Sequence, residues 1–403
     1  MTSASQVLEQ DKAVYPHIEP RCRYFGTCGG CSLQDLSYPD QLALKRQRLI
    51  QSLAPLGPLP PLDLIGMDDP WRYRGKAEFT FGQTGDGALT LGYHAAGSFW
   101  RIVDLEDCLL MPEAAMRIVR DALSLASRTG LPAYHPTTHQ GFFRYVVVRR
   151  SCATEQVALV LITTPGHRQA IEPIAQALRA THPRLCSVYW GTSARLADVA
   201  RPEELVLLAG EPQLEEQVGP FRLQLDPLSF LQPNPVLADR MYATLADAAG
   251  GLPDGTAWDL YCGVGLVSLY LAGRVRRVYG IDVEPHHLEL AGRNAQRHGI
   301  TNVEFRTGQV ETLLMDRRFW LQEAKPDLIV VDPPRAGFHP QALSSLLAAR
   351  AKRILYLSCN VQSLVRDLTA LGKGFPRYQV SLLRAFDMFP QTNHLETLAV
   401  LER

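Results

Sequence analysis

The sequence predicts an α/β protein with a doubly wound parallel sheet in its C-terminal part, preceded by a β-rich α+β region that carries a cysteine cluster. From about residue 225, apolar strand-like segments alternate with amphipathic helical segments, which is typical of a parallel sheet covered by helices. Upstream, strand-like segments follow one another with glycine-containing turns between them. We therefore expect a flexible N-terminus over residues 1–20, a cysteine-bearing central domain over 21–224 and an α/β domain over 225–403.

The first regular element expected is a helix near residues 38–54. Its Leu42, Leu49 and Leu53 lie roughly on one face, and we expect this helix to pack on the C-terminal domain. The proline-rich stretch PLGPLPPLD then interrupts regular structure. In the rest of the central domain we expect a helix near 170–180 and short strands within 71–106, 142–150, 156–164, 203–210 and 221–230.

The C-terminal domain is expected to alternate between strands and helices. The apolar segments predict strands at 257–261, 276–283, 302–308, 327–334 and 353–360. Helices are expected between them at 266–273, 286–299, 339–351 and 361–372. The segment ETLAVLER predicts a last strand over 396–403.

Composition excludes several classes of protein. Lys+Arg and Asp+Glu are both 41, so the net charge is zero, which argues against a purely electrostatic nucleic-acid binder but not against a local basic face. No stretch is long and apolar enough to span a bilayer, and the N-terminus lacks the pattern of a secretory signal. We expect a cytoplasmic protein, in which the eight cysteines are ligands, catalysts or buried small residues rather than disulfides.

The segment DLYCGVGL predicts a ligand-binding turn between a strand and a helix. Gly263 and Gly265 allow the backbone to turn tightly beside a ligand, and Asp282 follows about twenty residues later, where an acid binds ribose hydroxyls. Ser268 stands where the third glycine of a pyrophosphate-binding loop would be. The pattern therefore favours S-adenosylmethionine over NAD, and a packing turn without a ligand is the alternative.

Two further motifs end neighbouring apolar strands. The tandem prolines of DPPR stop the strand where ligands bind, so Asp332 is expected in the cleft. Cys359, in SCN, follows the next strand at the mouth of the same cleft, and the helix that starts after it is expected to lower its thiol pKa. The alternative for Cys359 is a buried structural cysteine. Glu396 reaches this cleft if the last strand joins the sheet.

DLYCGVG, DPPR, SCN and FPQTNHLE occur in this order, with SFLQPN upstream and CRYFGTCGGCSLQ near the front. This set resembles the RNA uracil-C5 methyltransferase family, whose members make 5-methyluridine in ribosomal and transfer RNA. The resemblance covers nearly the whole chain from about residue 20 and implies that the C-terminal domain is a Rossmann-like class I methyltransferase domain. We expect one difference from some members, namely that the N-terminal β-barrel RNA-binding domain is missing and the protein begins at the cysteine cluster.

The resemblance implies a mechanism in which Cys359 adds to carbon 6 of uracil and Glu396 later removes the proton on carbon 5. The adduct makes carbon 5 nucleophilic enough to take a methyl group from S-adenosylmethionine. By the same resemblance, the cofactor-binding residues are Gln232, Tyr261, Gly263, Gly265, Leu266, Asp282, Gln309 and Asp332. Residues implied to hold the flipped-out uracil or the RNA next to it are Phe230, Asp332, Arg74 and Lys76.

The cysteine cluster comprises Cys22, Cys28 and Cys31, and needs a fourth ligand. Cys108 follows a predicted strand, in a context similar to that of the family's fourth cysteine. Four thiolates hold zinc or an iron–sulfur cluster, and the spacing alone does not decide between them. The resemblance favours a [4Fe–4S] cluster, with zinc as the alternative, in a structural or RNA-contacting role rather than a radical one.

RNA is the expected partner, and 23S rRNA is favoured over tRNA because the related tRNA enzymes generally lack the cysteine cluster. The basic segments 45–48, 71–76 and 144–150 are expected to line the RNA path or to form solvated faces. Two other hypotheses are an iron–sulfur redox protein with a vestigial nucleotide fold and an RNA-binding folding factor. We expect a monomer with no obligate protein partner and no membrane association.

Overall fold

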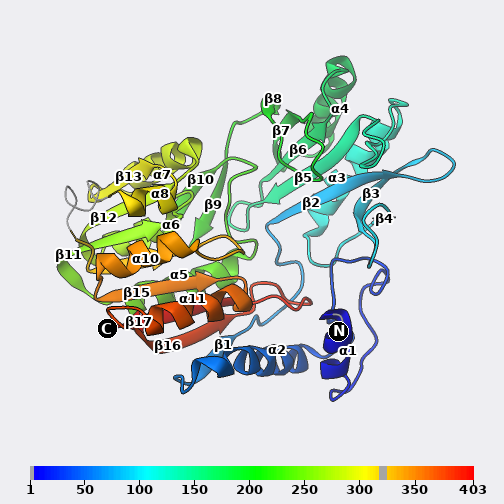
Figure 1. The fold of residues 1–403 in the computed structure, drawn as a ribbon. Helices are drawn as coiled ribbons and strands as arrows, with labels where there is room; N and C mark the ends of the chain where they lie inside the picture. Colours follow the sequence, from blue (N-terminus) through cyan, green and yellow to red (C-terminus); the bar gives the residue numbers. More distant parts are fainter. Residues whose placement is uncertain (1–3, 317–324) are drawn as a thin grey trace.

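A computed structural model describes residues 4–316 and 325–403, within which the strands form two large sheets (Figure 1). The order across the eight-stranded sheet is β1 (Leu62–Ile65), β16 (Gln379–Phe386), β17 (Glu396–Glu402), β15 (Arg353–Ser358), β14 (Leu328–Val331), β11 (Leu252–Leu260), β12 (Val275–Asp282) and β13 (Val303–Thr307). The strands from β15 to β13 pair in parallel, whereas β17 is antiparallel to both of its neighbours.

Helices cover both faces of the eight-stranded sheet. One face packs against α5 (Pro235–Ala249), α6 (Leu266–Ala272) and α7 (Pro285–Arg297). The other packs against α2 (Tyr38–Leu53), which continues into η1 (Ala54–Leu56), and against α8 (Val310–Met315), α10 (Pro340–Ala349) and α11 (Val361–Lys373). Alternation along β11 shows how the strands serve both cores, because Ala257 joins the first and Trp258 and Leu260 join the second. The doubly wound α/β architecture is thereby confirmed.

The second sheet has seven strands, in the order β4 (Ile102–Asp104), β3 (Leu89–His94), β2 (Lys76–Gln83), β5 (Phe143–Arg150), β6 (Val157–Thr163), β7 (Leu185–Thr192) and β8 (Glu204–Gly210). Only β6 and β7 pair in parallel in this sheet, and α4 (Arg168–Thr181) connects them. α3 (Glu113–Ser127) and α4 cover one face with a large apolar core. The opposite, helix-free face carries a smaller cluster that includes Tyr145 and Val147. A hairpin of β9 (Leu214–Val218) and β10 (Phe221–Leu225) precedes α5.

Several parts of the fold differ from the sequence prediction. Residues Ala4–Lys12 form helix α1 where a flexible N-terminus was expected, and the buried Leu8 packs in a cluster with Leu33 and Leu44. The proline-rich stretch ends in β1, which joins the edge of the eight-stranded sheet beside β16. Helices α3, α5 and α8 and strands β9 and β16 were not predicted. The domain boundary near residue 225 stays a prediction. Strand β1, which precedes that boundary in the sequence, belongs to the same sheet as the C-terminal strands.

The lengths and composition of the helices bear on membrane association. Across residues 4–316 and 325–403, no helix is long and apolar enough to cross a membrane.

Candidate active site

The candidate catalytic and cofactor-binding residues gather at one edge of the eight-stranded sheet. β11, β12, β14 and β15 run in parallel, so their carboxyl ends meet at the edge where α/β sheets bind ligands. Tyr261 follows β11, Asp282 ends β12, Asp332 follows β14 and Cys359 follows β15. Because β17 runs antiparallel to β15, its first residue, Glu396, lies at this edge as well.

The glycine turn after β11 is built from two glycines with different requirements. Gly265 has φ +82°, and an added Cβ would lie 2.8 Å from the Cβ of Ala291 and 2.9 Å from the ring of Phe305. Gly263 has φ +52°, but no atom lies within 4 Å of its added Cβ. Packing and backbone conformation therefore both demand glycine at 265, whereas conformation alone favours it at 263. Leu266 begins α6 with its side chain buried, which leaves its backbone for ligand contact.

Asp282 is tied to this turn. One of its carboxylate oxygens accepts a hydrogen bond from the Gly263 backbone N–H at 2.9 Å, and the other accepts one from the Glu284 N–H at 2.9 Å. Burial alone would raise the pKa of Asp282, but a hydrogen bond from His287 and these two N–H groups outweigh it, so the pKa is lowered. Asp282 is therefore a fixed carboxylate whose remaining lone pairs can accept ribose hydroxyls.

The other predicted cofactor and substrate residues come from the segments next to this edge and differ in how exposed they are. Tyr261 has φ +65°, and its hydroxyl donates a 2.6 Å hydrogen bond to Glu311 of α8. Gln309 is exposed and directly precedes the same helix. Gln232 is buried in the segment before α5, whereas Phe230 of that segment is 57% exposed and free to stack on a base.

Sequence reasoning missed the role of Asp259. Its carboxyl group is buried in β11 and accepts a 2.6 Å hydrogen bond from the fully buried Ser268 hydroxyl. Burial, together with the negative charges of Asp332 and Asp282, raises the pKa of Asp259 to about 7, although Ser268 partly opposes the shift. An acidic residue inside an otherwise apolar strand was the sequence feature that could have indicated this role. Its partner is Ser268, which stands where the third glycine of a pyrophosphate-binding loop would be.

The Cys359 thiol differs from the sequence prediction in its acidity. Burial raises its pKa to about 11, and the neighbouring carboxyl groups of Glu396 and Asp332 add to the shift, while Arg335 opposes it. The prediction that the following helix lowers this pKa was therefore wrong, because desolvation and two nearby acids outweigh it. Cys359 remains partly exposed and is thus accessible to a substrate.

Glu396 and Asp332 form an acidic pair beside the thiol. Glu396 is 3% exposed, and its Oε2 has no hydrogen-bond partner within the described parts of the chain. Burial raises its pKa well above the usual range, with a further contribution from Asp332 and opposition from Arg335. Burial likewise raises the pKa of Asp332 to about 6. A buried carboxyl oxygen without a partner calls for an explanation, and a bound substrate supplies one.

The two RNA-contact candidates of the central domain lie beside the segment that carries Phe230. The Gly75 N–H donates to the Pro233 carbonyl at 2.7 Å, which joins the two segments. Lys76 begins β2 and its Nζ lies 3.1 Å from a Glu78 carboxylate oxygen. Arg74 instead lines a cavity next to the cysteine cluster, and its Nε donates to the Lys76 carbonyl at 2.8 Å. Lys76 therefore belongs to β2, directly after the junction with the Phe230 segment, whereas Arg74 belongs to the lining of the cysteine cavity.

Three basic residues of the proposed RNA path are buried in structural roles. The Lys45 Nζ forms a 2.5 Å ion pair with Asp387, and both side chains are almost completely buried. Arg144 and Arg149 are buried as well and donate hydrogen bonds to main-chain carbonyls. For these residues the expectation of an exposed basic face was wrong, because each guanidinium or ammonium group is used to hold neighbouring loops.

All eight cysteines of the chain are free, and four of them share one cavity. This cavity is lined by Cys22, Cys28, Cys31 and Cys108. Within residues 4–316 and 325–403, however, no group of three or more Cys, His, Asp or Glu side chains is arranged to hold a metal ion. Cys262 and Cys186 are buried singly, which fits packing roles.

Comparison with known proteins places this site in a family. Residues 217–403 match the family model described as tRNA (Uracil-5-)-methyltransferase. Over 392 residues the chain is 35% identical to an uncharacterized RNA methyltransferase of Listeria innocua, an alignment that covers 95% of this chain and 83% of the relative. The chain belongs to the RNA uracil-C5 methyltransferase family. An uncharacterized RNA methyltransferase of Enterococcus faecalis is similar to the same degree, with 35% identity over 398 residues and coverage of 97% and 86%.

A solved structure supports the same RNA uracil-C5 methyltransferase membership. The tRNA (uracil-54, C5)-methyltransferase of Pyrococcus abyssi, in complex with S-adenosyl-L-homocysteine, matches with a TM-score of 0.74 and 26% identity. The match covers 93% of this chain and 84% of that chain. The Rossmann-like methyltransferase fold is thereby confirmed, with RNA as the substrate class and S-adenosylmethionine as the methyl donor. The carboxylate of Asp282 and the open space beside Gly263 fit this cofactor.

Proposed function

We propose that this protein methylates carbon 5 of a specific uridine in 23S rRNA, with Cys359 as the nucleophile and Glu396 as the base. One observation carries the assignment of these two residues. Ser358 lies opposite Thr397 across the antiparallel pair of β15 and β17, so the next residues, Cys359 and Glu396, meet at the sheet edge. A thiol and a buried, partnerless carboxyl group at one edge suit a reaction that needs both a nucleophile and a base.

The residues account for each covalent step. The Cys359 thiol gives its proton to water, and its sulfur bonds to carbon 6 of uracil, which moves the ring electrons to carbon 5 and the carbonyl oxygen as an enolate. S-Adenosylmethionine supplies the methyl group, which carbon 5 takes as S-adenosylhomocysteine leaves. Glu396 then removes the proton on carbon 5, the double bond re-forms and the carbon 6–sulfur bond breaks. The uridine must leave its stack to be attacked, and the exposed Phe230 is proposed to hold it.

The cofactor residues are proposed to divide the work of binding S-adenosylmethionine. Asp282 accepts the ribose hydroxyls, while Gly263 and Gly265 bring the backbone close to the ligand. The remaining contacts are proposed for Gln232, Tyr261, Leu266, Gln309 and Asp332. Lys76 and Arg74 are proposed to contact the RNA close to the target nucleotide.

Cys359→Ala tests the catalytic assignment. The variant should bind S-adenosylmethionine as the natural protein does but lose methyl transfer by more than about 10³-fold, since the covalent route is closed. Tritium release from RNA labelled at carbon 5 of uracil measures the reaction, and Cys262→Ala provides a matched cysteine control. Undiminished methyl transfer by Cys359→Ala would contradict the assignment of Cys359 as the nucleophile.

The choice of RNA rests on the cysteine cluster, and tRNA is the alternative. The solved enzyme of Pyrococcus abyssi is described as acting on uracil 54 of tRNA. Mass-spectrometric mapping of 5-methyluridine in both RNAs, with and without the gene, separates the two. Loss of one 23S rRNA methylation supports the proposal, whereas loss confined to tRNA overturns the substrate choice. We also propose that the protein acts as a monomer, which light scattering during size-exclusion chromatography tests.

Within the central domain proposed for residues 21–224, we propose that Cys22, Cys28, Cys31 and Cys108 hold a [4Fe–4S] cluster. The convergence of four thiols from two distant segments on one cavity supports this assignment. Four thiolates also hold zinc, which is the alternative occupant of this cavity.

Anaerobic purification tests the cluster independently of methylation. About four irons and four sulfides per chain, with a brown colour, are expected for a [4Fe–4S] cluster. Cys108→Ser should lower the iron content, while Cys186→Ser should not, because Cys186 lies apart in β7. A colourless protein with one zinc per chain and no iron would overturn the iron–sulfur assignment in favour of zinc.

A further inference from the structure

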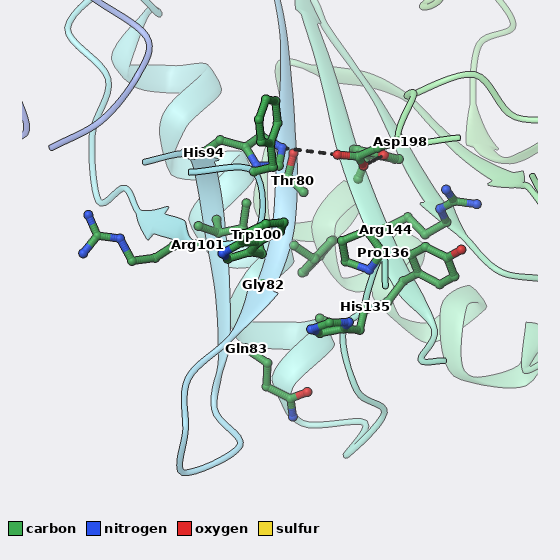
Figure 2. A pocket seen from close by; sticks show the side chains of 16 residues that line it. Thr80, Gly82, Gln83, His94, Trp100, Arg101, His135, Pro136, Arg144 and Asp198 are labelled. Atoms are coloured by element: carbon green, nitrogen blue, oxygen red, sulfur yellow. Dashed lines mark hydrogen bonds and ion pairs between the residues drawn. The ribbon is translucent and has the colours of Figure 1, made fainter. Parts of the chain in front are cut away.

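A cavity of about 300 Å³ lies on the seven-stranded sheet, in a part of the molecule that contains none of the catalytic candidates. Figure 2 shows its side chains, which come from β2, β3, β5 and the loops around them. Thr80 of β2 lies opposite Tyr145 of β5, and both line the cavity from the helix-free side of the sheet. The volume is within the lower range for sites that enclose small organic groups.

Two exposed aromatic rings form one side of this cavity. Phe99 and Trp100 lie in the connection between β3 and β4, and they are 80% and 68% exposed. Their ring centroids are 6.5 Å apart with an interplanar angle of 59°, so they do not cover each other. Arg101 follows directly and is exposed as well. Adjacent, uncovered aromatic rings beside a cation are typical of surfaces that stack on nucleobases.

The polar side of the cavity is centred on Asp198. Figure 2 shows Asp198 facing His94, whose Nε2 lies 3.5 Å from a carboxylate oxygen. The Tyr145 hydroxyl donates a hydrogen bond to the other oxygen. A carboxylate has about four lone-pair sites, so acceptor capacity remains after these two contacts. The His94 Nδ1 is buried without a hydrogen-bond partner in the described residues.

A buried arginine holds this polar side in place. Arg144 is 2% exposed, lines the cavity and stacks on the Tyr134 ring, with its guanidinium carbon 4.2 Å from the ring centroid. Its two terminal nitrogens donate hydrogen bonds of 2.6 to 3.1 Å to the carbonyls of Ser193, Arg195 and Ala197. These carbonyls belong to the loop that presents Asp198. The Nε of Arg144 lacks a partner among the residues that the structure describes.

We propose that this cavity binds one unpaired nucleotide of the RNA substrate, with a guanine base stacked on Trp100 and its edge at Asp198. Guanine presents adjacent N–H donors that a carboxylate can accept together. Arg101 is exposed next to Trp100 and can contact the phosphate. An apolar side chain of a protein partner would desolvate the Asp198 carboxylate and leave the His94 Nδ1 without a partner, which disfavours a protein occupant.

This inference rests on the proposed action on RNA but concerns a nucleotide other than the target uridine. The cavity residues all come from the segment 80–198, whereas the catalytic candidates Cys359 and Glu396 lie on the eight-stranded sheet. One bound base would give a sequence preference away from the methylated position. The seven-stranded sheet would then recognise one RNA base in addition to contacting the RNA sugar–phosphate backbone.

Fluorescence anisotropy with single-stranded RNAs of about 12 nucleotides tests the proposal. The probes are an all-uridine oligomer and versions that carry one central guanosine, adenosine or cytidine. The natural protein should bind the guanosine oligomer most tightly. Trp100→Ala should weaken binding of that oligomer about tenfold, because stacking on one base contributes about 1–3 kcal/mol. Asp198→Asn should abolish the preference for guanosine over adenosine while binding of the all-uridine oligomer stays unchanged.

Two control variants separate this proposal from its alternatives. Phe375→Ala removes an aromatic side chain that is 80% exposed, like Phe99, but distant in sequence, and it should bind all oligomers normally. Cys359→Ala should keep the guanosine preference although it does not methylate, so failure of the catalytic assignment would leave this result intact. If Trp100→Ala and Asp198→Asn bind all four oligomers as the natural protein does, the cavity is not a nucleotide site.

Discussion

Gln41 and Gln391 lie 350 residues apart in the sequence and exchange two hydrogen bonds in the buried interior. The Gln41 Nε2 donates to the Gln391 Oε1 at 2.9 Å, and the Gln391 N–H donates to the Gln41 Oε1 at 3.1 Å. The carbonyl of Gln391 accepts from the N–H groups of Ser32 and Leu33, next to Cys31. The loop that leads to Glu396 is therefore held by the N-terminal segment that carries the cysteine cluster.

Gln41→Ala should lower kcat by about tenfold while the affinity for S-adenosylmethionine stays unchanged. The variant leaves the buried N–H and the side-chain oxygen of Gln391 without their Gln41 partners, which costs about 1–3 kcal/mol and loosens the loop before Glu396. Single-turnover methylation and calorimetric cofactor binding measure the two effects. Gln47→Ala, on the same helix but exposed, is the control and should behave as the natural protein. Equal kcat values for both variants would contradict a positioning role.

Lys45→Met should destabilise the protein by about 3–5 kcal/mol, because it leaves Asp387 buried without its ion-pair partner. Burial lowers the pKa of Lys45 and raises that of Asp387, because desolvation disfavours the charged form of each group. The opposite charge of the partner offsets part of this cost in each case. Urea denaturation followed by circular dichroism gives the free energy of unfolding. Arg48→Met removes a surface ion pair with Asp11 and should cost about 1 kcal/mol or less. Similar losses for the two variants would show that the buried pair contributes little.

Glu396→Gln should trap the covalent RNA adduct. The amide has the size of the carboxyl group but cannot remove the proton on carbon 5, so the methylated base stays bonded to Cys359. A complex that survives denaturing electrophoresis and carries the radiolabelled methyl group is the expected observation. The double variant Cys359→Ala/Glu396→Gln should show no such complex. Normal turnover by Glu396→Gln would assign the base to another residue, with Asp332 the nearest alternative.

Arg335→Ala should shift the pH profile of methylation to higher pH. Arg335 opposes the raised pKa values of both Cys359 and Glu396, so its removal raises both pKa values further. At a given neutral pH, fewer molecules then carry the thiolate and the carboxylate, and activity falls until the pH is increased. Single-turnover rates between pH 6 and pH 10 measure this shift. Arg335→Lys keeps the positive charge, so its pH profile should stay close to that of the natural protein. An unshifted profile with a uniform loss of rate would indicate a contact with RNA instead.

Gly265→Ala and Gly263→Ala should differ in severity although they lie two residues apart. Alanine at 265 meets Ala291 and Phe305 at under 3 Å in a left-handed conformation, so we expect loss of folding or of cofactor binding. Alanine at 263 meets no protein atom within 4 Å and should cost folding only about 1–2 kcal/mol of backbone strain. Its Cβ would enter the space proposed for the cofactor, so binding of S-adenosylmethionine should weaken while the fold is kept. Thermal unfolding and calorimetric binding of S-adenosylmethionine compare them. Equal effects would show that steric contact at 265 is not the deciding factor.

Local features of the active site were predictable because they depend on residues that are neighbours in the sequence. The glycine turn, Asp282 after the next strand and Cys359 at a strand end all follow from periodicity and spacing, and the structure brings them to one edge. Membership in the RNA uracil-C5 methyltransferase family confirmed the fold class and the methyl donor. The roles of individual residues, the RNA target and the iron–sulfur cluster remain predictions.

Other features were decided only by tertiary structure. The sequence predicted a lowered pKa for Cys359 from its helix, but Glu396 and Asp332 arrive from other strands and raise it. Lys45 looked like part of a basic face until its burial against Asp387 was known. Hydrophobic periodicity and turn residues act over a few positions and so can be seen in the sequence. Burial and charge–charge interactions depend on distances between segments far apart in the chain, which only the folded structure determines.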